Sequence, residues 1–292
     1  MSQTLINAFS GFKYLRLNLR FRLLQSGALP ELKGSLFHGL LGNGLIRVDR
    51  NLYHALFVQH DNRAPKPYSL VCSDERAQLH QGQILALELR LFGHTVERAQ
   101  SLVESLQYAA SQLGIGPQRL LAELISVSSI VDAQEHVGIQ SVDLLRGWQS
   151  TESSYPECAL SLVSPLRIKH RGELLRHAPC ADIVINAIAR RFLSLCQYWY
   201  QDDPHLRELV YANIPNTHHI TTIDHTYWQE WQRYGKRGGN QCQFGGLQGM
   251  ISYQGAVADI QPWLSLGQTL QVGAKTTFGL GHYHLIRSEA LC

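Results

Sequence analysis

A strict alternation of apolar and polar residues near the N-terminus constrains the fold more than any other feature of the sequence. In residues 14 to 23 (YLRLNLRFRL), leucine or phenylalanine occupies every second position. Side chains of a β-strand point alternately to the two faces of its sheet, so this period of two predicts a half-buried strand. Arg16, Arg20 and Arg22 then share its polar face. That face is either simply solvated or part of a surface that contacts phosphates.

The rest of the N-terminal half alternates between helical and strand patterns. Apolar residues recur at helical spacing from Lys33 to Val48, and again from Thr95 to a glycine- and proline-containing stop at residues 113 to 117. Strand-like runs follow these two helices, at residues 83 to 93 and 120 to 131. The resulting order, β-α-β-(β)-α-β, is that of a ferredoxin-like domain.

The C-terminal half repeats this theme without repeating the residues. We predict a strand from Ala159 to Val163 and a helix from Ile183 to Tyr200, whose apolar residues recur as a core stripe. Residues 149 to 157 (QSTESSYPE) have the composition of a linker. The sequence therefore predicts an α+β protein of two tandem ferredoxin-like (RRM-like, βαββαβ) domains, residues 1–152 and 153–292, with a C-terminal glycine-rich loop.

The composition is that of a globular protein and excludes several other classes. The chain has 292 residues, of which 45% are hydrophobic and 17% charged, which argues against disorder. Because no apolar run is long enough to span a membrane and no signal peptide is recognisable, we expect a cytoplasmic protein. The six cysteines form no C-x-x-C pair, which predicts reduced thiols. The net charge is only +3, so the placement of charges must indicate any anionic partner.

Residues 245 to 285 contain a glycine-dense segment, GAKTTFGLG, between two strand-like runs. Glycine permits positive φ and close approach of a ligand, and successive amide groups can point at phosphate oxygens. We therefore expect an RNA-holding loop here. A tight hairpin that binds no ligand is the open alternative. The residues expected to contact RNA in this loop are Gly273, Lys275, Thr276, Thr277, Gly279 and Gly281.

Four segments of the C-terminal half together resemble one known family. They are SLVSPLRIKHRGEL (residues 161 to 174), the helix around residues 189 to 192, WQEWQRYGKRGG (residues 228 to 239) and the glycine-dense segment. The resemblance, which covers roughly residues 157 to 287, is to the CRISPR-associated endoribonucleases of the RAMP superfamily that process repeat RNA.

The resemblance implies an enzyme that cuts CRISPR precursor transcripts within their repeats. It implies attack by the 2′-hydroxyl of the RNA on the adjacent phosphorus, leaving a 2′,3′-cyclic phosphate and a 5′-hydroxyl. We expect no metal ion and no cofactor. The expected partners are CRISPR repeat RNA or guide RNA and, where the protein joins a CRISPR effector complex, other subunits of that complex; no membrane is involved.

His38 is the candidate general base. It lies at the edge of the apolar stripe of the first predicted helix, and Gly34 and Gly42 lie one turn before and after it, which we expect to clear space for an approaching backbone. Taken by itself, such a histidine is more often structural. The resembled family carries its general-base histidine on this helix, which makes catalysis the better hypothesis. The same family adds a tyrosine, lysine or arginine, and the candidates here are Lys33, Arg47 and Tyr53.

Other histidines offer rival sites. His282 and His284 lie on one face of a predicted strand and could act as an acid and base pair. His218, His219 and His225 could bind a metal, but they lack the carboxylate-histidine spacing of a specific site.

Basic residues of the C-terminal half are the candidate RNA contacts. Cations beside aromatic residues hold a phosphate backbone and stack on bases, whereas each cation alone is as readily a solvated surface residue. The candidates are Arg167, Lys169, Arg190, Arg191, Arg233, Lys236 and Arg237.

Two non-catalytic functions compete with the endoribonuclease. A RAMP subunit that only holds guide RNA would carry the same loop and the same cations. A general single-strand binder is less favoured, because the two-aromatic ribonucleoprotein signature is absent.

Overall fold

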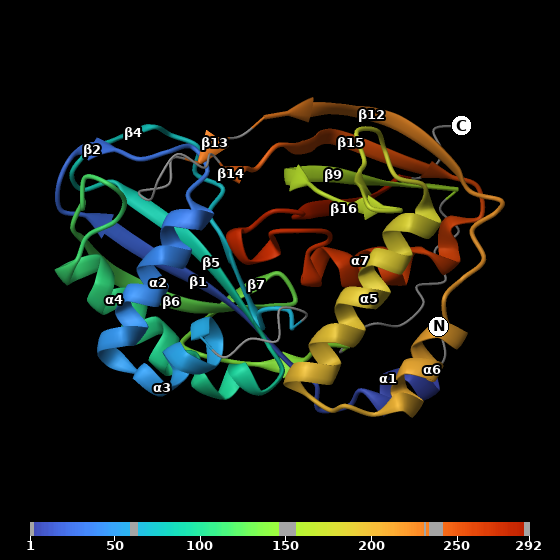
Figure 1. Ribbon diagram of the computed structural model, residues 1–292, viewed down its shortest axis with the longest axis horizontal. Coiled ribbons are helices and arrows are strands. Elements are labelled where there is room, and N and C mark those ends of the chain that lie inside the picture. Colours follow the sequence, from blue (N-terminus) through green and yellow to red (C-terminus); the bar gives the residue numbers. More distant parts are fainter. Residues whose placement is uncertain (1–2, 59–63, 146–155, 231, 234–241, 289–292) are drawn as a thin grey trace.

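The computed structural model describes residues 3–58, 64–145, 156–230, 232–233 and 242–288. They form two domains that lie side by side, with the N-terminal domain at the left of Figure 1 and the C-terminal domain at the right. Each domain is an antiparallel sheet with helices packed against it.

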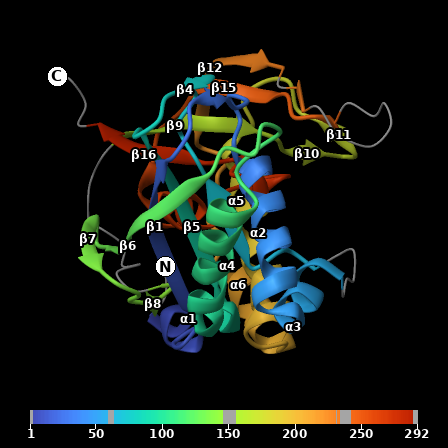
Figure 2. The ribbon, with the colours of Figure 1, turned by 90° about the vertical axis from the view of Figure 1, so that its left-hand side faces the viewer.

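The N-terminal domain is built on a sheet of strand order β3-β5-β1-β6-β7. Two helices, α2 and α4, lie side by side along it (Figure 2). The elements of this half are α1 (Gln3–Ala8), β1 (Lys13–Leu23), β2 (Gly27–Ala28), α2 (Gly34–Val48), α3 (Arg50–Tyr53), the π-helical turn η1 (His54–Val58), β3 (Tyr68–Val71), β4 (Gln78–Leu79), β5 (Ile84–Phe92), the 3-10 turn η2 (Gly93–Arg98), α4 (Ala99–Gln112), β6 (Ala122–Val131), β7 (Gln134–Val137) and β8 (Val142–Asp143).

The C-terminal domain has a four-stranded sheet of order β12-β15-β9-β16, with α5 and α7 packed together against it. The elements of this half are β9 (Glu157–Leu166), β10 (Lys169–His170), β11 (Glu173–Leu174), α5 (Ala181–Trp199), α6 (Pro204–Ala212), β12 (Thr221–Gln229), β13 (Gln232–Arg233), β14 (Cys242–Gln243), β15 (Gly246–Gln254), the 3-10 turn η3 (Val257–Asp259), α7 (Gln261–Leu270), the 3-10 turn η4 (Thr276–Phe278) and β16 (Tyr283–Ser288).

Both domains follow the predicted β-α-β-β-α-β succession. In the N-terminal domain the four common strands are β1, β3, β5 and β6, and in the C-terminal domain they are β9, β12, β15 and β16. When these strands are numbered in chain order, both sheets have the spatial order 2-3-1-4. This is the order of the ferredoxin-like motif.

The alternation in β1 places its leucines and Phe21 in the core and its arginines on the other face of the sheet. Each of these arginines pairs with a glutamate of another strand of the same sheet. Arg16 lies 2.5 Å from Glu88, Arg20 lies 3.1 Å from Glu135, and Arg22 lies 3.9 Å from Glu123. The stripe is thus charge-compensated, which favours the solvated-face interpretation over a phosphate-contacting surface.

The structure corrects the prediction of one glycine-dense loop between the two C-terminal strands. A ten-residue helix, α7, lies between β15 and β16. It begins at Gln261 with Pro262 in its first turn, a position where proline costs no backbone hydrogen bond. Gly267 lies within the helix because Ile188 and the hydroxyl of Tyr283 occupy the space that a Cβ would need. This glycine marks close packing and not a loop.

A buried polar seam joins the two domains. Arg90 of β5 is 2% exposed and donates to Glu88 (2.5 Å) and to the carbonyls of Gln268 (2.6 Å) and Thr269 (2.9 Å). Its Nη2 lies 3.0 Å from Nε2 of His282. The carbonyls belong to the last turn of α7, where helix groups lack intrahelical partners and carry partial negative charge. The N-terminal domain therefore supplies a cation that caps a helix of the C-terminal domain.

The N-terminal residues extend this connection. Leu5, Phe9 and Phe12 are fully buried in the hydrophobic core of the C-terminal domain. None of the helices in the described parts of the chain is long and apolar enough to cross a membrane.

Candidate functional site

His38 lies in an aromatic surround at the boundary between the domains. Its ring is half-buried, with ring centroids 5.0 Å from Phe57, 6.2 Å from Tyr68 and 4.8 Å from Phe278. Phe278 belongs to η4 of the C-terminal domain, whereas the other rings belong to the N-terminal domain. The imidazole therefore lies at the seam between the domains.

The two glycines that flank His38 on α2 do not leave the open space that the sequence suggested. A Cβ at Gly34 would overlap the carbonyl of Phe278, and a Cβ at Gly42 would lie 3.0 Å from the ring of Phe57. The glycines therefore admit the protein's own η4 and η1 segments. Gly39 is exposed, and a Cβ there would meet nothing within 4 Å. Next to His38, the surface of α2 is therefore open to solvent at Gly39.

Two lysines lie over the aromatic rings that contact His38. The ammonium of Lys66 lies 5.9 Å from the ring centroid of Phe57, and that of Lys275 lies 5.9 Å from the ring centroid of Phe278. Lys66 also donates a hydrogen bond to the carbonyl of Leu56. Burial lowers the pKa of Lys66 to about 8. Each of these two rings thus carries an ammonium group, one from each domain.

Lys275 has a left-handed backbone conformation, with φ of 67°. This conformation costs a residue with a Cβ roughly 1 to 2 kcal/mol relative to the right-handed helical region. Strained residues of this kind cluster at ligand and active sites. Lys275 is one of the RNA contacts predicted from the sequence, whereas Lys66, Phe57, Tyr68 and Phe278 are not among the predicted site residues.

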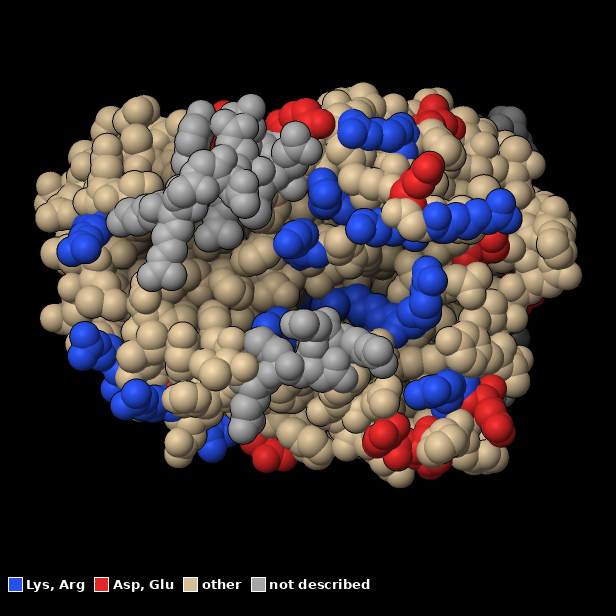
Figure 3. All heavy atoms as spheres, in the orientation of Figure 1, with Lys and Arg blue, Asp and Glu red and all other residues tan. Residues whose placement is uncertain are grey.

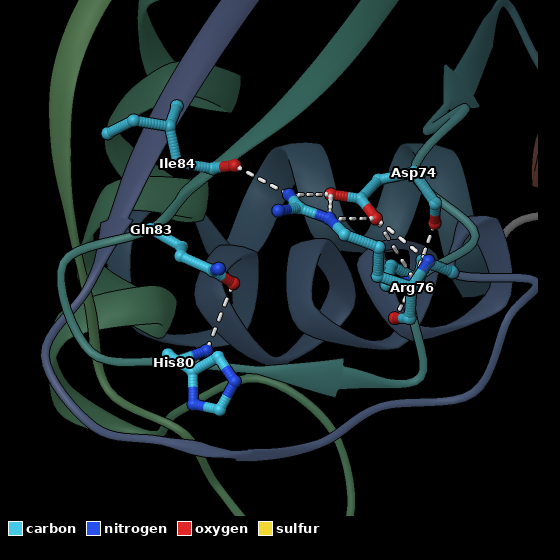
Figure 4. A network of polar contacts seen from close by, with 6 residues as sticks. Asp74, Arg76, His80, Gln83 and Ile84 are labelled. Atoms are coloured by element: carbon cyan, nitrogen blue, oxygen red, sulfur yellow. Dashed lines mark hydrogen bonds and ion pairs between the residues drawn. The ribbon is translucent and has the colours of Figure 1, made fainter.

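Lys33, a predicted helper of His38, has a structural environment. Its side chain is fully buried, and its ammonium donates to the carbonyls of Asp74 (2.5 Å) and Arg76 (3.0 Å). Burial lowers the pKa of Lys33. Figure 4 shows the surrounding loop, in which Arg76 bonds the carboxylate of Asp74 and the carbonyl of Ile84. Lys33 therefore fixes the start of α2 to this loop, and we leave it out of the proposed chemistry.

The other two predicted helpers lie further along the chain from His38. Arg47 is exposed in the last turn of α2, nine residues after His38. At about 1.5 Å of rise per residue, this separates their backbones by about 13 Å along the helix axis. Tyr53 is half-buried and stacks on Phe57 at 5.3 Å, on the ring that also contacts His38. Tyr53 thus supports the aromatic surround indirectly.

A basic groove of about 320 Å³ begins beside this site. It brings together four predicted cations that are separated in the sequence, and Figure 3 shows Lys and Arg side chains around a hollow in the middle of the molecule. The residues that line the basic groove are Pro65, Arg167, Ile168, Lys169, Ala187, Arg190, Arg191, Ser194, Gly273 and Ala274.

The lining of the basic groove is adjacent in sequence to two of the residues near His38. Pro65 and Ala274 line the groove, and each is followed directly by one of the two lysines over the rings, Lys66 and Lys275. Consecutive Cα atoms are only about 3.8 Å apart. The indole of Trp199 holds the carbonyl of Pro65 at 2.8 Å. A polyanion in the groove would thus lie close to the backbone of the two lysines.

The four cations of the groove are not equivalent. Arg167 donates to the carbonyl of Gly245, and Arg191 donates to the carbonyl of Leu270 at 2.7 Å. Burial, with Arg90 as a second cause, lowers the pKa of Arg191 to about 10. Lys169 and Arg190 are exposed. Arg167 and Arg191 therefore shape the groove wall, whereas Lys169 and Arg190 remain accessible to a ligand.

Several amides of the glycine segment bond the protein itself. Ala274 N donates to Arg167 O (2.8 Å), Gly279 N donates to Thr276 O (2.9 Å), and Gly281 N donates to Pro165 O (3.0 Å). This differs from the expected cradle of free amides.

The glycines of this segment are needed for packing within the protein. A Cβ at Gly273 would overlap the carbonyl of Arg167, one at Gly279 would approach Leu70, and one at Gly281 would overlap the carbonyl of Val272. Thr276 is 5% exposed, whereas Thr277 is half-buried. In this segment Lys275 and Thr277 are the better-placed of the predicted contacts.

The rival pair His282 and His284 is not arranged for acid and base catalysis. His282 is 5% exposed and bonded to Arg90. Burial, with Arg90 as a second cause, lowers the pKa of His282 to about 3, so this ring is neutral at physiological pH. His284 is exposed next to it. The structure thus makes His282 part of the domain seam, which corrects the rival hypothesis.

Several predicted contacts fall where the structure gives no side-chain description. Arg233 lies in β13, whose side chains are not described, and Lys236 and Arg237 lie outside the described residues. Among the described residues, no three histidine, cysteine, aspartate or glutamate side chains gather in a way that could hold a metal ion.

The fold and the site define a class. The chain is a two-domain α+β protein of antiparallel sheets, with a histidine at the domain boundary and a basic groove. Residues 160–283 match the family model described as CRISPR-associated endoribonuclease Cas6, and residues 12–144 match a model described only as an N-terminal domain. The match of residues 160–283 confirms the resemblance inferred from the sequence.

Solved structures share this fold at low sequence identity. The chain matches a Cas6 (TTHA0078) product complex with 19% identity and a TM-score of 0.53, and Thermus thermophilus Cas6 (TTHB231) with 16% identity and a TM-score of 0.57. Each match covers 94% of this chain and 99% of the other.

Two further matches are to longer chains. Both come from structures titled as Cas6-RT-Cas1–Cas2 complexes, one of them partial, with 15% identity, a TM-score of 0.59 and 95% of this chain covered. This chain spans only 46% and 29% of their lengths. No curated protein matches the sequence.

Proposed function

We propose that this protein is a Cas6-type endoribonuclease that cuts CRISPR precursor transcripts within their repeats. The observation that carries the proposal is the placement of His38 at the domain boundary, between two rings that each lie under a lysine, with a basic groove whose lining adjoins both lysines in the sequence. The Cas6 family match of the C-terminal half supports the substrate class. A histidine base and nearby ammonium groups are sufficient for RNA cleavage by internal attack.

In the proposed reaction, His38 removes the proton of a ribose 2′-hydroxyl. The 2′-oxygen forms a bond to the adjacent phosphorus, and the bond from phosphorus to the 5′-oxygen of the next nucleotide breaks. The departing oxygen takes a proton from solvent. The products are a 2′,3′-cyclic phosphate and a 5′-hydroxyl, and no metal ion takes part.

The charges around His38 suit this reaction. Negative charge grows on the phosphate oxygens as the 2′-oxygen attacks, and fixed cations at that place stabilise the transition state. Lys66 and Lys275 supply these cations from the two domains. The RNA backbone would lie along Lys169 and Arg190, which leads it toward the lysines. The aromatic rings next to His38 offer stacking surfaces for the bases at the cut.

A cleavage assay in EDTA tests the proposal. Purified protein is incubated with end-labelled repeat RNA, and the product ends are examined by treatment with phosphatase after mild acid, which opens a cyclic phosphate. We expect cutting at one position in the repeat, with cyclic phosphate ends, in the absence of divalent ions. Cutting that occurs only after Mg²⁺ is added contradicts the proposed chemistry.

A non-catalytic RAMP subunit that holds guide RNA is the second candidate. It is favoured by one observation, that the groove cations and the loop would serve binding alone equally well. In the same assay such a protein shifts the mobility of the repeat RNA and leaves it intact. Complexes with other CRISPR proteins, as in the titles of the longer matches, belong to either candidate.

A further inference from the structure

A second hollow, of about 220 Å³, adjoins the basic groove. Arg190 lines both hollows, so they meet at this side chain. The residues of the second hollow come from β10, α5 and α6: His170, Asp182, Ile183, Asn186, Arg190 and Tyr211. We call it the α5 pocket.

One face of α5 presents a row of polar side chains to the α5 pocket. Asp182, Asn186 and Arg190 are spaced by four residues, so they lie above one another on the helix, and all three are exposed. The Nε of Arg190 donates to the carbonyl of Asn186 at 3.2 Å, which lays the guanidinium back along the helix toward Asp182. The row therefore has an acceptor at one end and a donor fork at the other.

Neither end of the row is occupied by the protein. Within the described part of the chain, no ion pair or side-chain hydrogen bond engages the carboxylate of Asp182, and the Nη groups of Arg190 have no partner. The planar guanidinium of Arg190 carries five N–H donors, and only Nε donates to a described residue. Both groups are thus available to a ligand that presents acceptors next to donors.

The remaining walls suit a flat ring. Tyr211 on α6 is 49% exposed, and Ile183 is half-buried beside it. His170 ends β10 just before a two-residue hairpin turn, in which Arg171 and Gly172 have φ of 51° and 90°. Single-stranded RNA is recognised by stacking of its bases on such rings and by hydrogen bonds to the base edges.

We propose that the α5 pocket binds one guanine base of the RNA and makes binding selective for that position. Guanine has two acceptors, O6 and N7, for the fork of Arg190, and donors at N1 and the 2-amino group for Asp182. Adenine places a donor beside N7 and has no donor pair for the carboxylate. The inference rests on the proposed function, because the groove at Arg190 would hold the RNA backbone next to this base.

Base analogues test the α5 pocket atom by atom. Repeat RNAs are made with inosine, which lacks the 2-amino group, or 7-deazaguanosine, which lacks N7, at each guanosine in turn. Binding is measured for the wild type, Asp182→Ala and Asp202→Ala. Asp202 is an exposed carboxylate in the loop between α5 and α6, outside the α5 pocket, and its variant removes the same charge.

We expect one guanosine at which inosine weakens binding by roughly tenfold in the wild type and in Asp202→Ala, as for one hydrogen bond to a charged group. In Asp182→Ala, guanosine and inosine at that position should bind equally. The 7-deaza substitution should weaken binding at the same position in all three proteins. Equal tolerance of inosine at every guanosine, or full discrimination by Asp182→Ala, overturns the pocket.

Two further arms separate this inference from the proposed function. Cleavage is followed in the same samples, so loss of guanosine discrimination with normal cutting concerns the pocket alone. Short oligoribonucleotides with one guanosine or one inosine test the pocket even in a protein that does not cut repeat RNA. Guanosine monophosphate is titrated as a competitor. Tight binding of the free nucleotide that repeat RNA does not displace contradicts an RNA base as the occupant.

Discussion

The arginines of the N-terminal sheet and the cations of the basic groove are similar residues in opposite electrostatic settings. On β1, Arg20 and Arg22 each pair with a glutamate of another strand of the sheet. In the groove, Lys169 and Arg190 form no ion pair with any described carboxylate. A polyanion gains little from cations that are already neutralised, and it gains most where charge is uncompensated.

This difference suggests a division of work between the domains. The N-terminal domain supplies His38 and most of its aromatic surround, and the arginines on the exposed face of its sheet are paired with glutamates. The C-terminal domain supplies the groove and closes the site with η4. Substitutions in the first domain should then change cleavage, and substitutions in the groove should change binding.

The largest expected effect is that of His38→Ala. Removal of a general base lowers a rate by roughly a hundred- to ten-thousandfold, while the groove keeps its charge. Single-turnover cleavage and binding of repeat RNA should therefore separate, with affinity changed by no more than a few fold. His284→Ala, an exposed histidine of the other domain, is the matched control. Normal cleavage by His38→Ala would remove this residue from the chemistry.

Lys66→Met should have a smaller effect, of about tenfold on the cleavage rate at pH 7, because it removes one of two cations near the phosphate. Since burial lowers the pKa of Lys66 to about 8, its ammonium is present below pH 8 and is lost as the pH rises above 8. The wild-type kcat/KM should fall across this range, and the variant should lack that fall. Lys13→Met, at an exposed ion pair with Asp143, should behave as the wild type. An unchanged alkaline profile in Lys66→Met would contradict a role for this ammonium.

A stability comparison concerns the glycine segment that closes the site. Gly281→Ala forces a Cβ onto the carbonyl of Val272 at φ of 71°, whereas Gly82→Ala has a similar φ of 84° with nothing within 4 Å. We expect Gly82→Ala to cost about 1 kcal/mol of unfolding free energy and Gly281→Ala several kcal/mol. Urea unfolding of both variants measures the difference. If both variants lose the same unfolding free energy, the segment around Gly281 can shift to accommodate a Cβ, and its packing is not what holds the domains together.

The fold was largely predictable because the hydrophobic patterns that define its strands and helices are local in the sequence. The alternation in β1 and the helical stripe of α2 each lie within about fifteen residues of sequence, and both elements form with the expected buried faces. The helix α7 was missed because Pro262 and Gly267 are typical of loops. Proline is tolerated in the first turn, and the glycine is required by Tyr283, a contact that only the tertiary structure shows.

The site was only partly predictable for the same reason. His38 and the groove cations stand out by residue type and by the family resemblance, but the partners of His38 are Phe57, Tyr68 and Phe278, far apart in the sequence. Lys66 lies in a loop with no motif, and only its burial and its position over Phe57 distinguish it. Sequence pattern likewise could not show that the glycine amides bond the protein itself.

The most direct test of the account compares two double variants that each remove two positive charges. Lys169→Ala with Arg190→Ala alters the groove, and Arg20→Ala with Arg22→Ala alters the N-terminal sheet. Affinity for repeat RNA is measured over a range of salt concentrations. The groove pair should reduce the slope of log affinity against log salt by about 0.7, for the phosphate contact of Lys169, because Arg190 contacts the base in the α5 pocket, and the sheet pair should leave it unchanged. An equal reduction by the sheet pair would contradict the division between a balanced sheet and a binding groove.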